Sequence, residues 1–103
     1  MKIEAQLKQD WLTALKSGEY VQGTSHFMSN NKHCCLGVLC EVAKIPLHAQ
    51  YDADNWDGIK KLLNVDANAS VEDDLDELWK ANDGQCDGKY TVVIPLIEAI
   101  PTT

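Results

Sequence analysis

The sequence predicts a mainly α-helical fold, a compact single-domain bundle of four or five short helices over residues 1–103, with a short β-hairpin near residues 20–33. Three observations predict it. The chain of 103 residues has room for one hydrophobic core. Its apolar residues, 45% of the total, recur mostly at the three- and four-residue spacing of amphipathic helices. Glycine, proline and asparagine fall between these periodic segments, where they end helices.

The first helix is expected over residues 3–17. Its apolar side is formed by Ile3, Leu7, Trp11, Ala14 and Leu15. Ser17-Gly18 ends it, because glycine adopts the left-handed conformation that often follows a helix. Residues 19–33 are rich in small polar residues, which predicts a loop or a short hairpin that turns at Asn30-Asn31.

The second helix is expected over residues 34–45, ended by Pro46. Only Glu41 and Lys44 are charged in this segment, and a helix that is apolar nearly all round belongs in the middle of a bundle. Gly37 costs about 1 kcal/mol in helix propensity, which close packing against a neighbouring element would offset.

Three further segments complete the bundle. A short helix is expected near residues 56–64, and another at about 71–81, opened by the capping box Ser70-Val71-Glu72-Asp73 and ended by Asn82-Asp83-Gly84. Residues 90–100 are ambiguous, because the β-branched run 91–94 favours a strand whereas Pro95 and the spacing of the apolar residues favour a helix. We favour a helix that begins near Ile94.

The densest group of chemically active side chains is His33-Cys34-Cys35-Leu36-Gly37-Val38-Leu39-Cys40. The favoured interpretation is that its cysteines act as small buried hydrophobic residues of the core. Two alternatives stay open. The first is a structural zinc ion, although the spacing differs from the usual close pairs of ligands. The candidate ligands are His33, Cys34, Cys35, Cys40 and Cys86, with His26 or His48 as an additional donor.

The second alternative is a reactive thiol. Cys34 and Cys35 fall at the start of the expected helix, next to His33, and the positive end of a helix dipole lowers the pKa of a thiol. A nucleophilic cysteine also needs a base and an orienting group, and no motif in the sequence supplies them.

Charge divides the chain into two unequal halves. Residues 1–49 hold five lysines and four acidic residues, for a net charge of +1, whereas residues 50–103 hold four lysines and twelve acidic residues, for −8. The chain has no arginine, and no basic face is evident, so direct binding of nucleic acid is not expected. An acidic half instead favours a basic protein partner. The candidate partner-binding residues are Asp52, Asp54, Asp57, Glu72, Asp73, Asp74, Asp76 and Glu77.

Membrane insertion and secretion are not expected either. No apolar run approaches the roughly 20 residues that a membrane-spanning helix requires. The first six residues are charged and amphipathic, unlike a secretory signal. The cytosol is the expected compartment, and the cysteines are expected as thiols or metal ligands there.

Two segments of the sequence resemble a known group of proteins. They are Trp11-Leu12-x-Ala14-Leu15-Lys16-Ser17-Gly18-x-Tyr20-x-Gln22-Gly23 and Cys34-Cys35-Leu36-Gly37-Val38-Leu39-Cys40. The chain is similar to small proteins of unassigned function encoded in bacteriophages and prophages, which carry a W-L-x-A-L-R-S-G-x-Y-x-Q-G segment and a C-C-L-G-V-L-C helix. The likeness is specific over residues 11–43. It departs at Lys16, where arginine is usual, and at His33, where glycine or an aromatic residue is usual.

The resemblance implies a phage-encoded accessory protein that acts in the cytosol of a bacterial host, with no catalytic residues to carry over. We therefore expect a non-enzymatic inhibitor of a bacterial defence system, similar in role to anti-CRISPR proteins, that needs no cofactor. Its partner would be a host protein with a basic, nucleic-acid-binding groove, bound through the acidic half of the chain. A zinc-stabilised binding module, a thiol enzyme and a nucleotide-sequestering protein are the alternatives.

Overall fold

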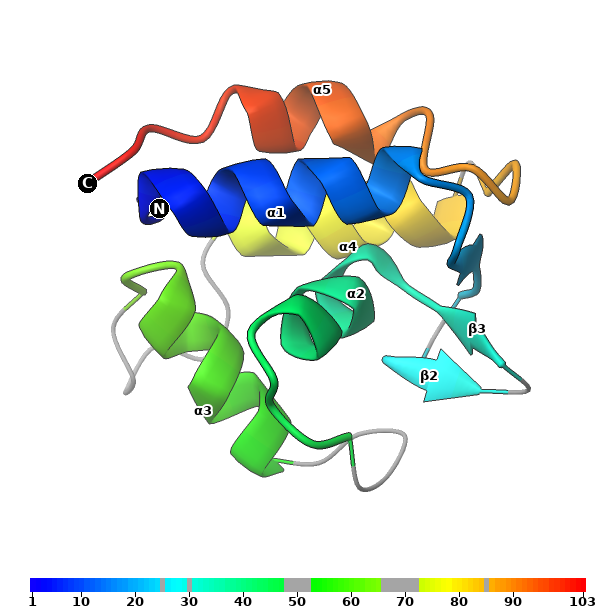
Figure 1. Ribbon diagram of the computed structural model, residues 1–103, viewed down its shortest axis with the longest axis horizontal. Coiled ribbons are helices and arrows are strands. Elements are labelled where there is room, and N and C mark those ends of the chain that lie inside the picture. The colour runs from blue at the N-terminus through cyan, green and yellow to red at the C-terminus, as the bar shows by residue number, and fades with distance from the viewer. Residues whose placement is uncertain (25, 30, 48–52, 66–72, 85) are drawn as a thin grey trace.

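The computed structural model describes residues 1–24, 26–29, 31–47, 53–65, 73–84 and 86–103. These residues form five helices and a small three-stranded sheet, and helices account for about half of the chain (Figure 1). The elements in chain order are α1 Ala5–Lys16, β1 Val21–Gln22, β2 Met28–Ser29, β3 Lys32–His33, α2 Cys35–Val42, α3 Ala53–Leu62, α4 Asp73–Gly84 and α5 Val93–Glu98. No helix of the described ranges combines the length and apolar content needed to cross a bilayer.

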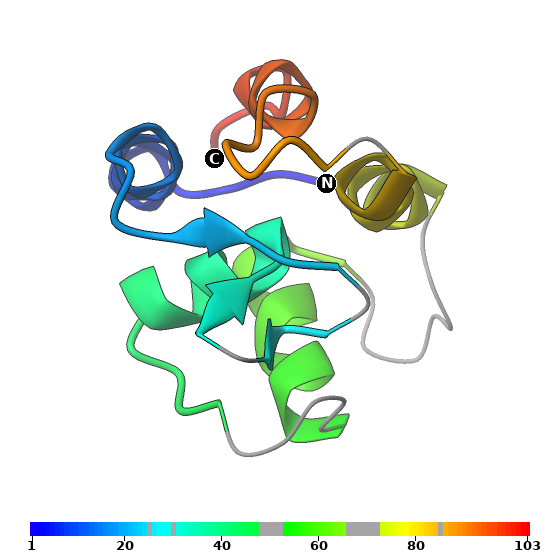
Figure 2. The same cartoon turned by 90° about the vertical axis from the view of Figure 1, so that its right-hand side faces the viewer.

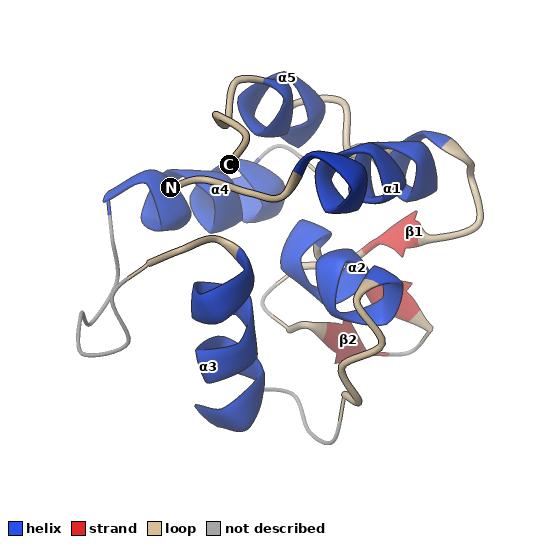
Figure 3. Cartoon of the chain, turned by 60° about the vertical axis from the view of Figure 1, so that its left-hand side comes forward, coloured by secondary structure: helices blue, strands red, loops and turns tan. Residues whose placement is uncertain are grey.

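Helix α2 lies at the centre of the structure, as its nearly all-apolar sequence predicts. It packs against α1, α3 and α4, and every residue from Cys35 to Cys40 is buried. Figure 3 shows α2 between α3 on one side and the sheet on the other. Helix α5 packs on α1 and α4, which lie on opposite sides of it (Figure 2).

Helix α1 begins two residues later than predicted, because Ile3 is used elsewhere. The Ile3 amide donates to Pro101 O, and Ile3 pairs with Thr102 in a parallel bridge. Glu4 caps the helix instead, since its carboxylate accepts from the amides of Gln6 and Leu7 at 3.0 and 2.8 Å. These two hydrogen bonds lower the pKa of Glu4.

The predicted hairpin is present and belongs to a larger sheet. Strands β2 and β3 pair antiparallel on either side of residues 30–31, as expected. The sheet also contains β1, which pairs parallel with β3 and places Gln22 opposite His33. Because each strand has two residues, no period-two pattern long enough to reveal β1 exists in the sequence.

The C-terminal end of helix α4 differs from the predicted one. Asn82-Asp83-Gly84 does not end the helix before residue 82, because α4 continues to Gly84. The Asn82 side chain is fully buried and bonded to other elements, and these tertiary hydrogen bonds outweigh the local turn preference of the sequence. The predicted capping box has three of its four residues, 70–72, outside the described residues.

The C-terminal segment is helical from Val93 to Glu98, which confirms the helical interpretation and excludes a strand there. Two of its carbonyl oxygens accept hydrogen bonds from a lysine of α1. Lys8 of α1 donates to the carbonyl oxygens of Glu98 and Ile100, at 2.7 and 2.6 Å. The last turn of α5 is thereby held against α1.

Replacing Gly37 with alanine should lower the free energy of unfolding by about 3 kcal/mol or more, at the upper end of the range for overpacked cores. An added Cβ would lie 1.9 Å from the carbonyl oxygen of Phe27, which is backbone and cannot move aside easily. Urea denaturation measures this. Gly84→Ala is the matched control, because a Cβ there meets nothing within 4 Å, and a change within about 0.5 kcal/mol is expected. Equal effects of the two substitutions would contradict the close approach of α2 to Phe27.

Candidate functional site

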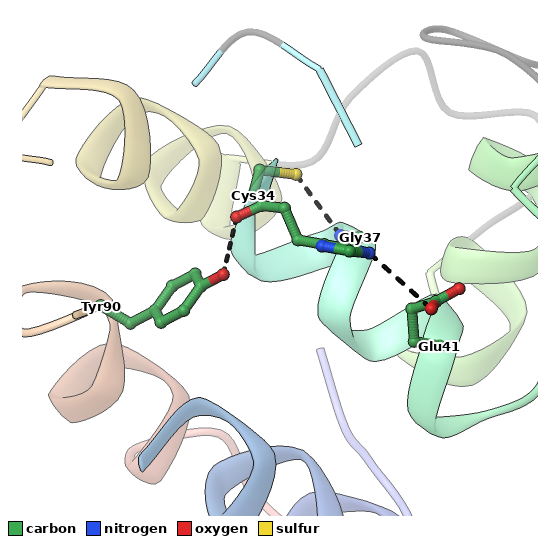
Figure 4. A network of polar contacts seen from close by, with 5 residues as sticks. Cys34, Gly37, Glu41 and Tyr90 are labelled. Atoms are coloured by element: carbon green, nitrogen blue, oxygen red, sulfur yellow. Dashed lines mark hydrogen bonds and ion pairs between the residues drawn. The ribbon is translucent and has the colours of Figure 1, made fainter. Parts of the chain in front are cut away.

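The thiol cluster is part of the core. Cys34 is 6% exposed, and Cys35 and Cys40 are fully buried, which confirms the favoured interpretation for these three residues. Cys34 precedes α2 and caps it, since the Gly37 amide donates to Cys34 Sγ at 3.4 Å (Figure 4). The fourth cysteine, Cys86, is exposed, and its thiol donates to Gln22 O at 3.5 Å.

The surroundings of the three buried sulfurs keep them protonated. Burial raises the pKa of Cys34 to about 11, although the Gly37 amide acts in the opposite direction. Burial also raises the pKa of Cys35 well above its usual value and that of Cys40 to about 12. The helix start therefore does not activate Cys34 or Cys35, because desolvation of the thiolate exceeds the effect of the helix dipole.

His33 directly precedes this cluster in the chain, and it is 8% exposed. Its ring packs edge-on against Tyr20, with 5.0 Å between the ring centroids. Nε2 lies 3.7 Å from the Glu41 carboxylate, an ion-pair distance that is too long for a hydrogen bond. Burial lowers the pKa of His33, and the nearby Glu41 only partly offsets this.

The five zinc candidates do not form a ligand set. Within the described ranges, no three side chains of His, Cys, Asp or Glu converge as metal ligands do. Cys34 already accepts a hydrogen bond from Gly37, and Cys86 contacts the Gln22 carbonyl. His48, one of the additional donors considered, lies outside the described residues. This geometry lends no support to the zinc alternative.

A buried polar network that the sequence did not predict joins the same elements. Asn82 Oδ1 accepts from Gln22 Nε2 and from the Cys35 amide, both at 3.1 Å. Its Nδ2 donates to Gly23 O at 2.9 Å and to Asp83 Oδ1 at 3.0 Å. A fully buried asparagine with all of these bonds is a structural residue. In the sequence it is part of an Asn-Asp-Gly run, which is typical of a turn.

Tyr90 extends this network to the C-terminal segment. Its amide donates to Gln22 Oε1 at 2.8 Å, and its hydroxyl donates to His33 O at 2.7 Å (Figure 4). Tyr90 has a φ of 63°, in the left-handed region that non-glycine residues seldom adopt. The two hydrogen bonds hold it there, and burial raises the pKa of its hydroxyl.

The predicted partner-binding residues are spread over two helices. Asp57 is exposed on α3, while Asp76 and Glu77 lie on α4, where Glu77 is exposed and Asp76 forms an ion pair with Lys80 at 2.7 Å. Helices α3 and α4 each pack on α2. Asp54, Asp73 and Asp74 fall within α3 and α4, whereas Asp52 and Glu72 lie outside the described residues.

Helix α4 therefore carries the larger part of the candidate surface. Its residues 73–77 include four acidic residues and no basic one. We call this stretch the α4 acidic segment. Lys80 is the single lysine of α4, and it lies over the ring of Trp79 as well as beside Asp76.

Comparison with known proteins identifies one family. A family model described as "Domain of unknown function (DUF8296)" matches residues 1–92. No curated protein and no solved structure matches the chain.

Titration with dithionitrobenzoate should modify one thiol of the native protein quickly and the other three only after unfolding. Cys86 is exposed, whereas Cys34, Cys35 and Cys40 are buried and protonated at neutral pH. Absorbance of the released thiol anion at pH 7.5, with and without guanidinium, measures the two groups. Cys86→Ser should abolish the fast reaction. Fast labelling of a second thiol in the native protein would contradict the buried cluster.

Folding stability should fall as the pH decreases below about 6.5. Because the folded-state pKa of His33 lies below its unfolded value of 6.5, the unfolded chain binds the proton first. The contribution of His33 is complete above pH 6.5 and is lost as the pH falls through the folded-state pKa. Urea denaturation at pH 7.5 and 5.0, in the natural protein and in His33→Gln, measures it, and the variant should lose less stability. A natural protein that became more stable over this interval would show that the Glu41 ion pair outweighs burial.

Proposed function

The chain belongs to the DUF8296 family, and we propose that this member is a non-enzymatic binding protein whose α4 acidic segment docks on a basic groove of a partner protein. The observation that carries the proposal is the division of charge, with −8 on residues 50–103 against +1 on residues 1–49. Opposite charge on the two partners accelerates their encounter and selects against acidic competitors.

The exposed position of described acidic side chains supports the proposal. Glu77 and Asp57 are exposed, and neither is held by an ion pair among the residues that the structure describes. Their carboxylates can thus form charge-assisted hydrogen bonds to lysine or arginine of a partner.

The state of the three buried thiols disfavours chemistry at these sulfurs. The three cysteines of the helix α2 region are buried and have raised pKa values, so that their thiols stay almost entirely protonated near neutral pH. The catalytic alternative would require a thiolate beside an imidazole that can take up a proton. Burial lowers the pKa of His33 and works against that second requirement as well.

The setting follows from the resemblance to phage-encoded proteins over residues 11–43. In that setting the partner is a protein of a bacterial defence system, in the cytosol of the host, and the basic groove is one that otherwise binds nucleic acid. Occupying that groove with carboxylates competes with the phosphates of the natural ligand. The role resembles that of an anti-CRISPR protein.

Reversing charge on α4 should weaken partner binding about tenfold or more, because like charges facing each other across an interface cost several kcal/mol. The variant is Asp76→Lys with Glu77→Lys. The matched control is Asp10→Lys with Glu19→Lys, on and just after α1, which Figure 2 shows on the opposite side of the structure from α4. Each pair changes the net charge from −7 to −3, because every exchange adds two charges.

Affinity capture from a bacterial lysate, with quantitative mass spectrometry at low and high salt, compares the two pairs. We expect a basic nucleic-acid-binding protein that the natural chain and the α1 control retain and the α4 variant loses. Circular dichroism melting checks that both variants fold. Equal retention by all three proteins would refute docking through the α4 acidic segment.

A further inference from the structure

A small pocket adjoins the α4 acidic segment. It has a volume of about 170 Å³ and lies where α4, α5 and the two terminal segments of the chain meet. Its walls come from Leu78 of α4, Leu96 of α5, residues 99–101 and Met1, and Glu77 of α4 is the acidic residue of the lining.

The pocket has the size of one long side chain. An apolar cavity of about 150 Å³ holds one benzene molecule, which has six non-hydrogen atoms. A lysine side chain has five non-hydrogen atoms beyond Cα and fits such a volume in extended form. Leu78 and Ile100 are nearly fully buried and provide apolar walls for its methylene groups.

Glu77 gives the pocket a carboxylate that complements a cation. Glu77 is exposed, and its carboxylate forms no ion pair within the part of the chain that the structure describes. The neighbouring Asp76 differs, because Lys80 already neutralises it at 2.7 Å. The ammonium group of Lys8 is bound by the carbonyl oxygens of Glu98 and Ile100. The free carboxylate beside an apolar wall therefore selects an aliphatic chain that ends in a positive charge.

We propose that this pocket receives a lysine side chain of the basic partner, with the methylene groups against Leu78, Leu96 and Ile100 and the ammonium group at Glu77. The inference rests on the proposed function, since it names the contact that the α4 acidic segment makes. The shape of the pocket also restricts which basic partners bind, whereas charge complementarity alone would accept many basic surfaces.

The side-chain chemistry can be tested without the partner. Titration of n-butylammonium, which reproduces the lysine side chain, should shift the backbone amide signals of Leu78, Leu96 and Ile100 in a saturable way in ¹H–¹⁵N spectra. Glu77→Gln should weaken this binding about threefold, as for a partly exposed ion pair. Asp76→Asn, with the same change of net charge one residue away, should change it less than about 1.5-fold for the same reason.

Two analogues separate cation recognition from simple apolar binding. Because n-butanol keeps the chain and lacks the charge, it should bind more weakly than n-butylammonium. Butyrate tests whether the positive charge of Met1, another residue of the lining, outweighs Glu77, and it should not bind. Equal binding of n-butanol, tighter binding of butyrate, or no shift with n-butylammonium would each overturn the proposal.

A steric variant tests the pocket in the complex. Ala99→Leu enlarges a residue of the pocket lining without changing any charge. Because Ala99 is exposed and directly follows α5, we expect the variant to fold as the natural protein does. Both n-butylammonium binding and capture of the partner should fall at least threefold, with an unchanged melting temperature. If Ala99→Leu retains the partner while Asp76→Lys with Glu77→Lys loses it, the lysine pocket is wrong and acidic docking stands. If that double variant also retains the partner, the proposed function itself is wrong.

Discussion

The Asn82 side chain is the contact on which the arrangement of the elements depends. One carboxamide joins the end of α4 to the first amide of α2, to Gln22 of β1 and to the carbonyl oxygen of Gly23. The Gln22 side chain also accepts a hydrogen bond from the Tyr90 amide, and the Tyr90 hydroxyl donates to the carbonyl oxygen of His33 in β3. Leaving one of these buried groups without its partner would lower the free energy of unfolding by about 1–3 kcal/mol. The network therefore favours a single relative placement of α2, α4 and the sheet over other apolar packings.

The helical part of the fold could be predicted because it follows from apolar spacing. The stripe of Trp11 and Leu15 predicts α1, and the almost uniformly apolar sequence of α2 predicts its central position. Strand β1 could not be predicted, because its pairing with β3 is set by residues eleven positions apart that share no local pattern. The end of α4 lies beyond the predicted one for a related reason, since the hydrogen bonds of Asn82 are made to Gly23 and Cys35, which are distant in the sequence. Tertiary hydrogen bonds to distant residues override the local secondary-structure preference of the sequence.

The candidate site likewise has features that the sequence predicts and features that only the fold creates. The burial of Cys34, Cys35 and Cys40 could be inferred from the apolar residues between them, and the raised pKa values follow from burial. The acidic character of residues 73–77 is likewise evident from the sequence. The pocket cannot be predicted from the sequence, because its walls come from Met1, from α4 and from residues 96–101. Only the folded chain brings the Glu77 carboxylate, which forms no ion pair with the residues that the structure describes, to an apolar pocket made of three distant segments.

Pairing of the two chain ends has a consequence for how the protein is made. Ile3 is fully buried, and its backbone bonds are made to residues 101 and 103. During translation, residue 3 leaves the ribosome long before these partners are synthesised, so Ile3 stays without these bonds until residues 101–103 emerge. This part of the core therefore closes only after residues 101–103 are available, and Ile3 lacks these backbone partners in a shorter nascent chain.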